Sequence, residues 1–79
     1  MKINPIEYYR MRYPEGIIVE LEEPIIDTYG NNKPAGARFK VSFIDDMGSM
    51  HGNWLAPQSG TLAIIIEHDK FKIVFDEEG

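Results

Sequence analysis

The sequence contains no cysteine, which excludes disulfide bonds and thiolate metal ligands. It also lacks a long apolar run: the longest, Leu62 to Ile66, is far shorter than the roughly 20 residues that cross a bilayer. The opening residues, MKINPIEYYRMRYPEG, have no apolar stretch of the kind found in secretory signals. We therefore expect a cytoplasmic protein that is neither secreted nor inserted into a membrane.

Positive charge is also scarce. The 79 residues include eight Lys and Arg against 13 Asp and Glu, which gives a formal net charge of -5 at pH 7. This balance disfavours non-specific attraction to nucleic acid, because such binding depends on Lys and Arg displacing counterions from phosphates. With 43% hydrophobic and 11% aromatic residues, the chain is expected to fold as one domain, residues 1–79, and not as a disordered acidic tail.

A short helix and a linker are predicted over residues 1–16. Asn4 is a favourable N-cap residue, and Pro5 suits the first helical position because its ring already fixes φ. The proline and glycine of the following YPEG run are expected to end the helix by Arg12 or Tyr13. A helix this short needs to dock on the rest of the domain in order to persist.

Five strands are predicted from the alternation and the β-branched content of the remaining chain. The most regular one places Phe39, Val41 and Phe43 on one face, with Arg38 and Lys40 on the other. The predicted strands are 17–21, 37–44, 49–55, 61–68 and 71–75. The predicted core comprises Val19, Leu21, Phe39, Val41, Phe43, Trp54, Leu62, Ile64, Ile66, Phe71 and Ile73, with Phe75 also facing inward.

The connections between these strands predict the fold class. Residues 22–36 contain prolines, glycines and asparagines at a density that forbids a regular element, so they form a long loop, which apolar anchors help to order. Residues 45–48 and 56–60 are tight turns, and a single helical turn is expected just before the last strand. This order is typical of a mainly β protein, a small five-stranded SH3-like barrel over residues 17–75, with an acidic tail at 76–79.

Several segments also resemble a known family. The runs YPEG, PAGARFKV, FIDDMGSMHGNW and EHDKFKIV are similar to those of small uncharacterised domains from Gram-positive bacteria, their phages and their conjugative elements. The resemblance covers Tyr13 to Val74, and its most specific part runs from Asp45 to Trp54. It departs from the family pattern at Ile17, Ala37, Phe39 and Gly52. It implies a mobile-element context but no catalytic residue.

Metal binding and catalysis are both weakly indicated. Asp45, Asp46, His51, His68 and Asp69 are candidate ligands, but no pair has the spacing that would fix two ligands on one face. We interpret the two aspartates as part of a hairpin turn, and expect neither a metal nor a cofactor. No serine or threonine lies in a nucleophile motif, so we expect a protein that is not an enzyme.

Protein binding is the favoured functional interpretation. Tyrosine and tryptophan are enriched at interface hot spots, and the helix and the long loop can lie beside one another in an SH3-like topology. Trp54 is instead expected to pack in the core, because the alternation of the strand places it on the same face as Met50. The candidate binding residues are Tyr9, Tyr13, Tyr29, Glu22, Glu23 and Asp27. Tyr8, in the helix, is a further candidate.

Two alternatives concern nucleic acid. The domain could mimic nucleic acid in the groove of a host nuclease or defence effector, if its carboxylates line one face. The candidate contacts for mimicry are Glu20, Glu22, Glu23, Asp27, Asp45 and Asp46. It could instead bind nucleic acid directly through a basic surface, and the candidate residues are then Arg38, Lys40, Lys70 and Lys72.

Overall fold

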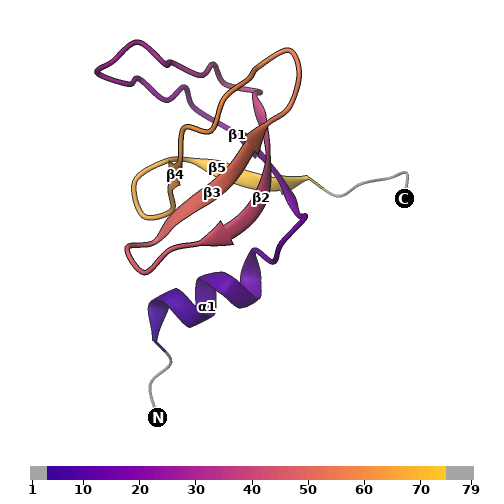
Figure 1. Ribbon diagram of the computed structural model, residues 1–79, viewed down its shortest axis with the longest axis vertical. Helices are drawn as coiled ribbons and strands as arrows, with labels where there is room; N and C mark the ends of the chain where they lie inside the picture. The colour runs from indigo at the N-terminus through magenta and orange to yellow at the C-terminus, as the bar shows by residue number, and fades with distance from the viewer. Residues whose placement is uncertain (1–3, 75–79) are drawn as a thin grey trace.

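A computed structural model describes residues 4–74 of the chain (Figure 1). These residues form one helix and a single antiparallel sheet of five strands. Phe75 and the acidic tail at 76–79 lie outside the described residues. The elements are α1 (Pro5–Arg12), β1 (Ile18–Leu21), β2 (Arg38–Ile44), β3 (Ser49–Trp54), β4 (Ile64–Ile65) and β5 (Phe71–Val74).

The helix α1 begins and ends where the sequence predicts. The side chain of Asn4 accepts a hydrogen bond from the backbone N–H of Ile6 at 2.8 Å, and Pro5 occupies the first helical position. At the other end the N–H of Tyr13 donates to the carbonyl of Tyr9 at 2.8 Å. The helix has eight residues, so in the described part of the chain no helix is long and apolar enough to cross a membrane.

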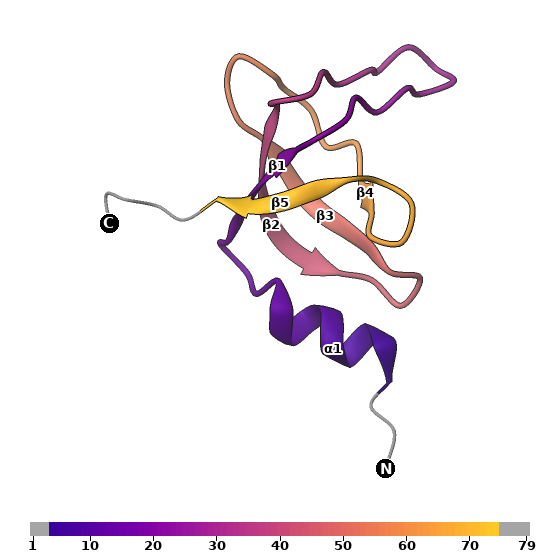
Figure 2. The same cartoon turned by 180° about the vertical axis from the view of Figure 1, so that it is seen from behind.

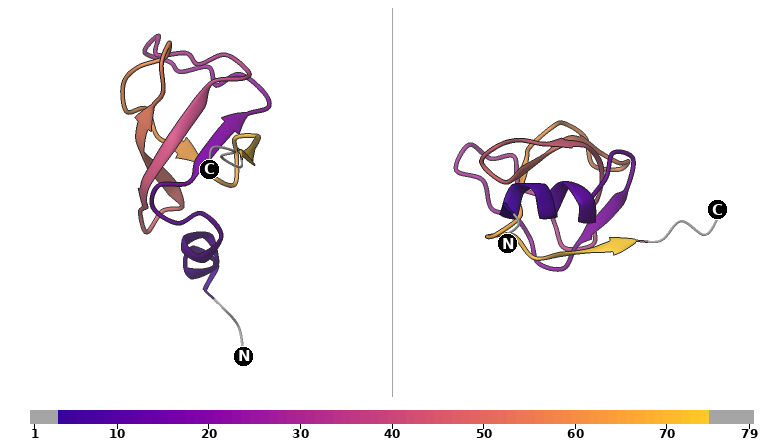
Figure 3. Two further views of the ribbon diagram at one scale, coloured as in Figure 1. Left: turned by 90° about the vertical axis from the view of Figure 1, so that its right-hand side faces the viewer. Right: turned by 90° about the horizontal axis from the view of Figure 1, so that it is seen from below.

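The sheet has the strand order β4-β3-β2-β1-β5, so four consecutive strands form a meander and β5 returns to pair with β1 (Figures 1 and 2). The sheet is not closed: within residues 4–74 no pairing joins β4 to β5. The expected closed barrel is therefore not confirmed, although a mainly β fold with five strands is. Figure 3 shows α1 lying across one end of the strongly curved sheet.

The fourth strand is much shorter than the predicted 61–68, because backbone groups at both of its ends bond to partners outside the sheet. Before the strand, the carbonyl of Leu62 accepts the indole N–H of Trp54 at 2.8 Å. After it, the chain turns, since the carbonyl of Ile65 accepts from the N–H groups of His68 and Asp69. Only Ile64 and Ile65 are left to pair with β3.

Most of the predicted core is confirmed. Phe39 and Trp54 meet edge to face with ring centroids 4.9 Å apart, an arrangement that aromatic rings prefer. Ala37, Ile44 and Met50 are also buried, although the predicted core did not include them. The buried core consists of Val19, Leu21, Ala37, Phe39, Val41, Ile44, Met50, Trp54 and Ile64; Ile66, Phe71 and Ile73 are partly buried against it, and Leu62 is half-buried.

The prediction that Phe43 lies in the core is wrong, since its side chain is 58% exposed. The pairing of β2 with β3 shifts between Val41 and Phe43, which is a β-bulge. The extra residue, Ser42, turns Phe43 outward and Ile44 inward. Gly52 permits the close strand approach at this point, because a Cβ atom there would collide with the carbonyl oxygen of Lys40.

Candidate functional site

The 22–36 loop leaves β1, returns to β2 and is hydrogen-bonded along its length. Ile25 and Lys33 pair across it through two backbone bonds of 2.9 and 3.0 Å. At the tip, one carboxylate oxygen of Asp27 accepts from the N–H groups of Tyr29 and Asn31, both at 3.2 Å, and from the Asn31 side chain at 3.1 Å. These bonds give the loop a defined conformation, as its apolar anchors predict.

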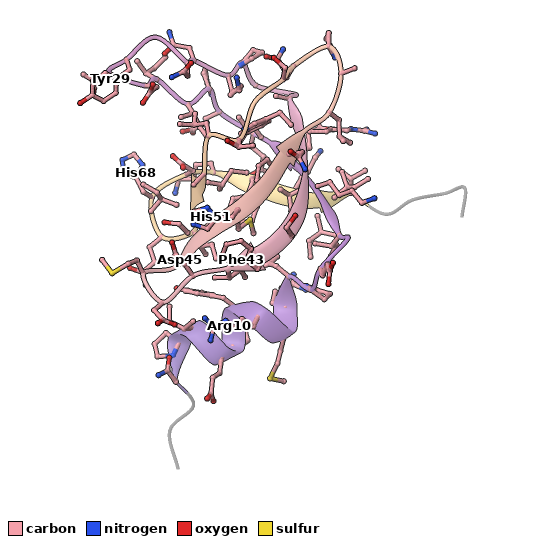
Figure 4. The ribbon with its side chains drawn as sticks, viewed as in Figure 1. Arg10, Tyr29, Phe43, Asp45, His51 and His68 are labelled. Atoms are coloured by element: carbon pink, nitrogen blue, oxygen red, sulfur yellow. The ribbon has the colours of Figure 1, made fainter. Side chains whose placement is uncertain are left out.

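This defined loop presents large apolar side chains to solvent. Tyr29 is 88% exposed and Ile26 is 76% exposed, whereas their neighbour Ile25 packs against the core. Figure 4 shows Tyr29 projecting from the end of the loop, away from the sheet. Single exposed apolar residues are ordinary, but here two large ones lie three positions apart on one hydrogen-bonded loop. The acidic residues Glu22 and Glu23 are exposed where the loop begins.

The helix tyrosines predicted to bind a partner have intramolecular contacts instead. The hydroxyl of Tyr9 donates to Glu67 at 3.0 Å, and this hydrogen bond raises the pKa of Tyr9 above its ordinary value. The Tyr13 ring meets Phe71 edge to face at 5.4 Å. Both residues therefore help to attach α1 and the following segment to the sheet, while Tyr8 stays 51% exposed.

The helix and the 22–36 loop do not form one face, contrary to the expectation from an SH3-like topology. Figures 1 to 3 place α1 at one end of the sheet and the loop at the other. The reason is that α1 docks on the turn between β2 and β3, where Gly48 lies against Ile6 and Tyr9, whereas the loop emerges from the opposite ends of β1 and β2. Tyr29 is therefore separated from Tyr9 and Tyr13.

The carboxylates considered for mimicry are also dispersed. Asp27 closes the loop tip, while Asp45 and Asp46 occupy the β2–β3 turn beside α1. Glu20 lies in β1 between two strands and pairs with Arg38 at 3.0 Å. Most of these groups are bonded within the chain and they lie in three separate places, which removes the single acidic face that mimicry requires.

The β2–β3 turn confirms the turn interpretation of the two aspartates. One carboxylate oxygen of Asp45 accepts the N–H groups of Met47 at 2.9 Å and Ser49 at 3.0 Å. The other lies 2.7 Å from Nε2 of His51, which donates because an ionised carboxylate can only accept. The hydrogen bond from His51, followed by those from Ser49 and Met47, lowers the pKa of Asp45 to about 2.

Arg10 connects the helix to this turn, a role that sequence reasoning missed. Its guanidinium donates to the carbonyl of Ile44 through two bonds of 3.1 and 3.0 Å and to Asp46 at 3.0 Å. Nearby, the rings of Phe43 and His51 stack with centroids 4.8 Å apart (Figure 4). No sequence signal linked Arg10 to residues more than thirty positions away, because an exposed arginine on a short helix is ordinary.

The His51–Asp45 pair resembles a base with its orienting carboxylate, but its contacts are structural. Asp45 closes the turn, and the face of the imidazole is covered by Phe43. Within residues 4–74, no three histidine or carboxylate side chains come together as metal ligands would. Asp69 is likewise engaged in a turn, where it accepts the N–H of Ile65 at 2.8 Å.

The basic residues proposed for nucleic acid lie partly together. Arg38 and Lys72 flank Glu20 in the sheet, at 3.0 and 4.0 Å from its carboxylate, so their charges are partly neutralised. Lys40 lies on the same outer face of β2 and lines a hollow of about 480 Å³ with Asn53. Lys70 is exposed ahead of β5, where its carbonyl accepts from Glu22.

A family model described as a domain of unknown function, DUF4314, matches residues 3–74. The chain belongs to this family. Neither a curated protein nor a solved structure gives a significant match to the chain.

Family membership agrees with the resemblance noted in the sequence and extends it through the helix. The DUF4314 match contains all of the elements described above, from α1 to β5. It therefore includes the hydrogen-bonded loop and the Asp45 turn in one unit. The family description supplies no activity, so function has to be argued from the surfaces of this domain.

Proposed function

We propose that this DUF4314 domain is a non-enzymatic protein-binding module that uses the 22–36 loop. The observation that carries the proposal is the exposure of Tyr29 and Ile26 on a loop held in one conformation by Asp27. Tyrosine offers a large contact area with few rotatable bonds, and a preorganised loop loses little further entropy on binding. Both properties favour a specific contact.

The partner is proposed to carry a basic surface. Glu22 and Glu23 are exposed at the start of the loop, and the whole chain has a net charge of -5. Opposite charges at an interface accelerate encounter and reject acidic competitors. Under this proposal the partner is a cytoplasmic protein of a Gram-positive host or of its phages and conjugative elements, as the sequence resemblance implies.

The test compares two tyrosines at opposite ends of the domain. The parent, Tyr29→Ala and Tyr8→Ala proteins are immobilised, exposed to nuclease-treated host lysate, and the retained proteins are identified by mass. The affinity of each retained protein is then measured with purified components at low and high salt. A partner of the loop binds Tyr29→Ala at least about tenfold more weakly, as expected for a hot-spot residue, and binds Tyr8→Ala normally.

Either of two results would overturn the proposal. One is a partner that binds the parent and Tyr29→Ala equally, since the loop then makes no important contact. The other is a partner lost only with Tyr8→Ala, which would move the binding site to α1. Salt should weaken the complex, because the charge contribution is screened over about 10 Å at 0.1 M ionic strength.

A second candidate function is direct binding of single-stranded nucleic acid to the outer face of the sheet. It is favoured by one observation: Phe43 is 58% exposed on the face that also carries Lys40 and Arg38. Bases stack on exposed aromatic rings while basic groups contact the phosphates. The neutralising effect of Glu20 and the acidic net charge make this candidate weaker.

Fluorescence anisotropy with a labelled oligonucleotide tests this candidate. Phe43→Ala and Lys40→Gln should each weaken binding, and Lys70→Gln, which changes a basic residue outside the sheet, should affect it less. Equal affinity of the Phe43→Ala variant and the parent would exclude stacking on this face.

A further inference from the structure

Lys33 is a largely buried residue with an unusual set of neighbours. It is only 9% exposed, and it is the only buried charged residue within residues 4–74. Lysine is rarely buried without an anionic partner, because its ammonium loses hydration. Among the described residues, no carboxylate lies within ion-pair distance of Lys33, and its side chain donates no hydrogen bond to protein.

The surroundings hold the ammonium of Lys33 in place without neutralising it. The ammonium lies 5.7 Å from the centroid of the Trp54 ring, close enough for a cation–π attraction. Trp54 is itself fixed by the hydrogen bond from its indole N–H to the carbonyl of Leu62. The ammonium in such a contact can still donate hydrogen bonds, because a cation–π contact does not occupy its N–H groups as an oxygen acceptor would.

A small hollow adjoins Lys33. Its volume is about 290 Å³, and no Asp or Glu lines it. In the described part of the chain, every fully buried side-chain nitrogen or oxygen has a hydrogen-bond partner. The ammonium of Lys33 has no such partner, so it is not fully buried and retains access to solvent. The lining residues are Asn31, Lys33, Ser59, Gly60, Thr61 and Leu62.

The other lining groups are rich in hydrogen-bond donors. Ser59 and Thr61 contribute hydroxyls, and the Asn31 side-chain amide has one N–H left after its bond to Asp27. The backbone N–H groups of Gly60 and Thr61 donate to no protein oxygen within residues 4–74. A cation accompanied by hydroxyl and amide donors, without a carboxylate, is the combination that recognises oxyanions.

We infer that this hollow is a binding site for a single oxyanionic group, a phosphate or a carboxylate, with Lys33 as the charged ligand. The volume of about 290 Å³ is sufficient for one such group. The inference is independent of the proposed contact through Tyr29. It names a separate site between the loop and the segment at residues 59–62, where a free anion or an anionic group of a partner is held.

The test is an NMR titration of the ¹⁵N-labelled full chain with inorganic phosphate at neutral pH and constant ionic strength. We expect saturable shifts of the amides of Lys33, Gly60 and Thr61. Lys33→Gln should weaken binding at least tenfold, and Arg12→Gln, which removes a positive charge from α1 at the other end of the domain, should leave it unchanged. A parallel titration with acetate separates a tetrahedral from a planar ligand, since saturation by acetate alone assigns the site to carboxylates.

A second variant tests the site independently in case Lys33→Gln does not fold. Thr61→Val keeps Lys33 and the shape of the side chain while removing a hydroxyl, and should weaken binding severalfold with an otherwise unchanged spectrum. The inference is overturned if neither anion gives saturable shifts in the parent. It is also overturned if the shifts persist with equal affinity in both variants, because the anion then binds without Lys33 and Thr61.

Discussion

The two ends of the sheet differ in how their polar and aromatic groups are used. At the helix end, Arg10, Tyr9 and Asp45 each bond to a partner in the chain. At the loop end, Tyr29 is exposed and Lys33 is buried without an anionic partner. Similar residue types thus attach the helix to the sheet at one end, whereas at the other end they are free to contact a ligand or partner. Availability of a side chain, and not its type, separates a candidate binding site from a structural contact.

Removing Trp54 should give the largest effect, because this residue supports the loop end from within the core. Trp54→Ala deletes a side chain that is 5% exposed and leaves the Leu62 carbonyl without its donor, so we expect a loss of about 3–5 kcal/mol in unfolding free energy. Phe43→Ala, at 58% exposure, should cost less than about 1 kcal/mol. Urea denaturation measures both, and similar losses would contradict the bulge that turns Phe43 outward.

Detaching the helix end should give an intermediate effect. Arg10→Ala removes the bonds to Ile44 and Asp46 from a side chain that is 46% exposed, so we expect a loss of about 1 kcal/mol together with reduced helix content by circular dichroism. Arg12→Ala, whose residue only approaches the Tyr13 ring, is the matched control and should cost less than about 0.5 kcal/mol. The same comparison should leave the exchange rates of the loop amides unchanged, because the loop lies at the far end.

Acid should weaken the β2–β3 turn selectively. The pKa of Asp45 is lowered from 3.8 to about 2 by His51 and the turn amides, so its ionised form stabilises the folded state. This contribution is complete above the unfolded pKa and is lost as pH falls through about 2. Melting temperature should therefore decline more steeply in the parent than in Asp45→Asn over this acidic range. Parallel curves for the two proteins would show that Asp45 is not stabilised in this way.

The smallest effect on stability is expected for Tyr29→Ala, since the removed ring is 88% exposed. The unfolding free energy should change by less than about 0.5 kcal/mol, as for other surface substitutions. Tyr9→Ala removes the bond to Glu67 and the contact with the turn, so it should cost more, about 1–2 kcal/mol. A loss for Tyr29→Ala as large as that for Tyr9→Ala would mean that the loop tip is a structural contact.

The elements set by neighbouring residues were predictable from the sequence. Asn4 and Pro5 define the start of α1, and Asp45 with Gly48 define the hairpin turn, because caps and turns depend on a few adjacent residues. Phe43 was misplaced because a bulge interrupts the alternation, and the bulge depends on the approach of Gly52 in another strand.

The candidate sites were less predictable than the fold. The sequence places Tyr29 in the long loop, but its separation from Tyr9 depends on where α1 docks, which no local pattern specifies. The burial of Lys33 depends on Trp54, more than twenty positions away in the chain. A lysine in a run of polar loop residues carries no sequence signal for burial.

The shortness of β4 has a consequence for how copies of the domain behave towards one another. An open sheet exposes unpaired backbone groups at its margins, and a long, flat margin invites another chain to add a strand and aggregate. β4 contains only Ile64 and Ile65, and Asp69 already occupies the N–H of Ile65. The outer edge of β4 therefore offers almost no free backbone to which a second copy could add a strand.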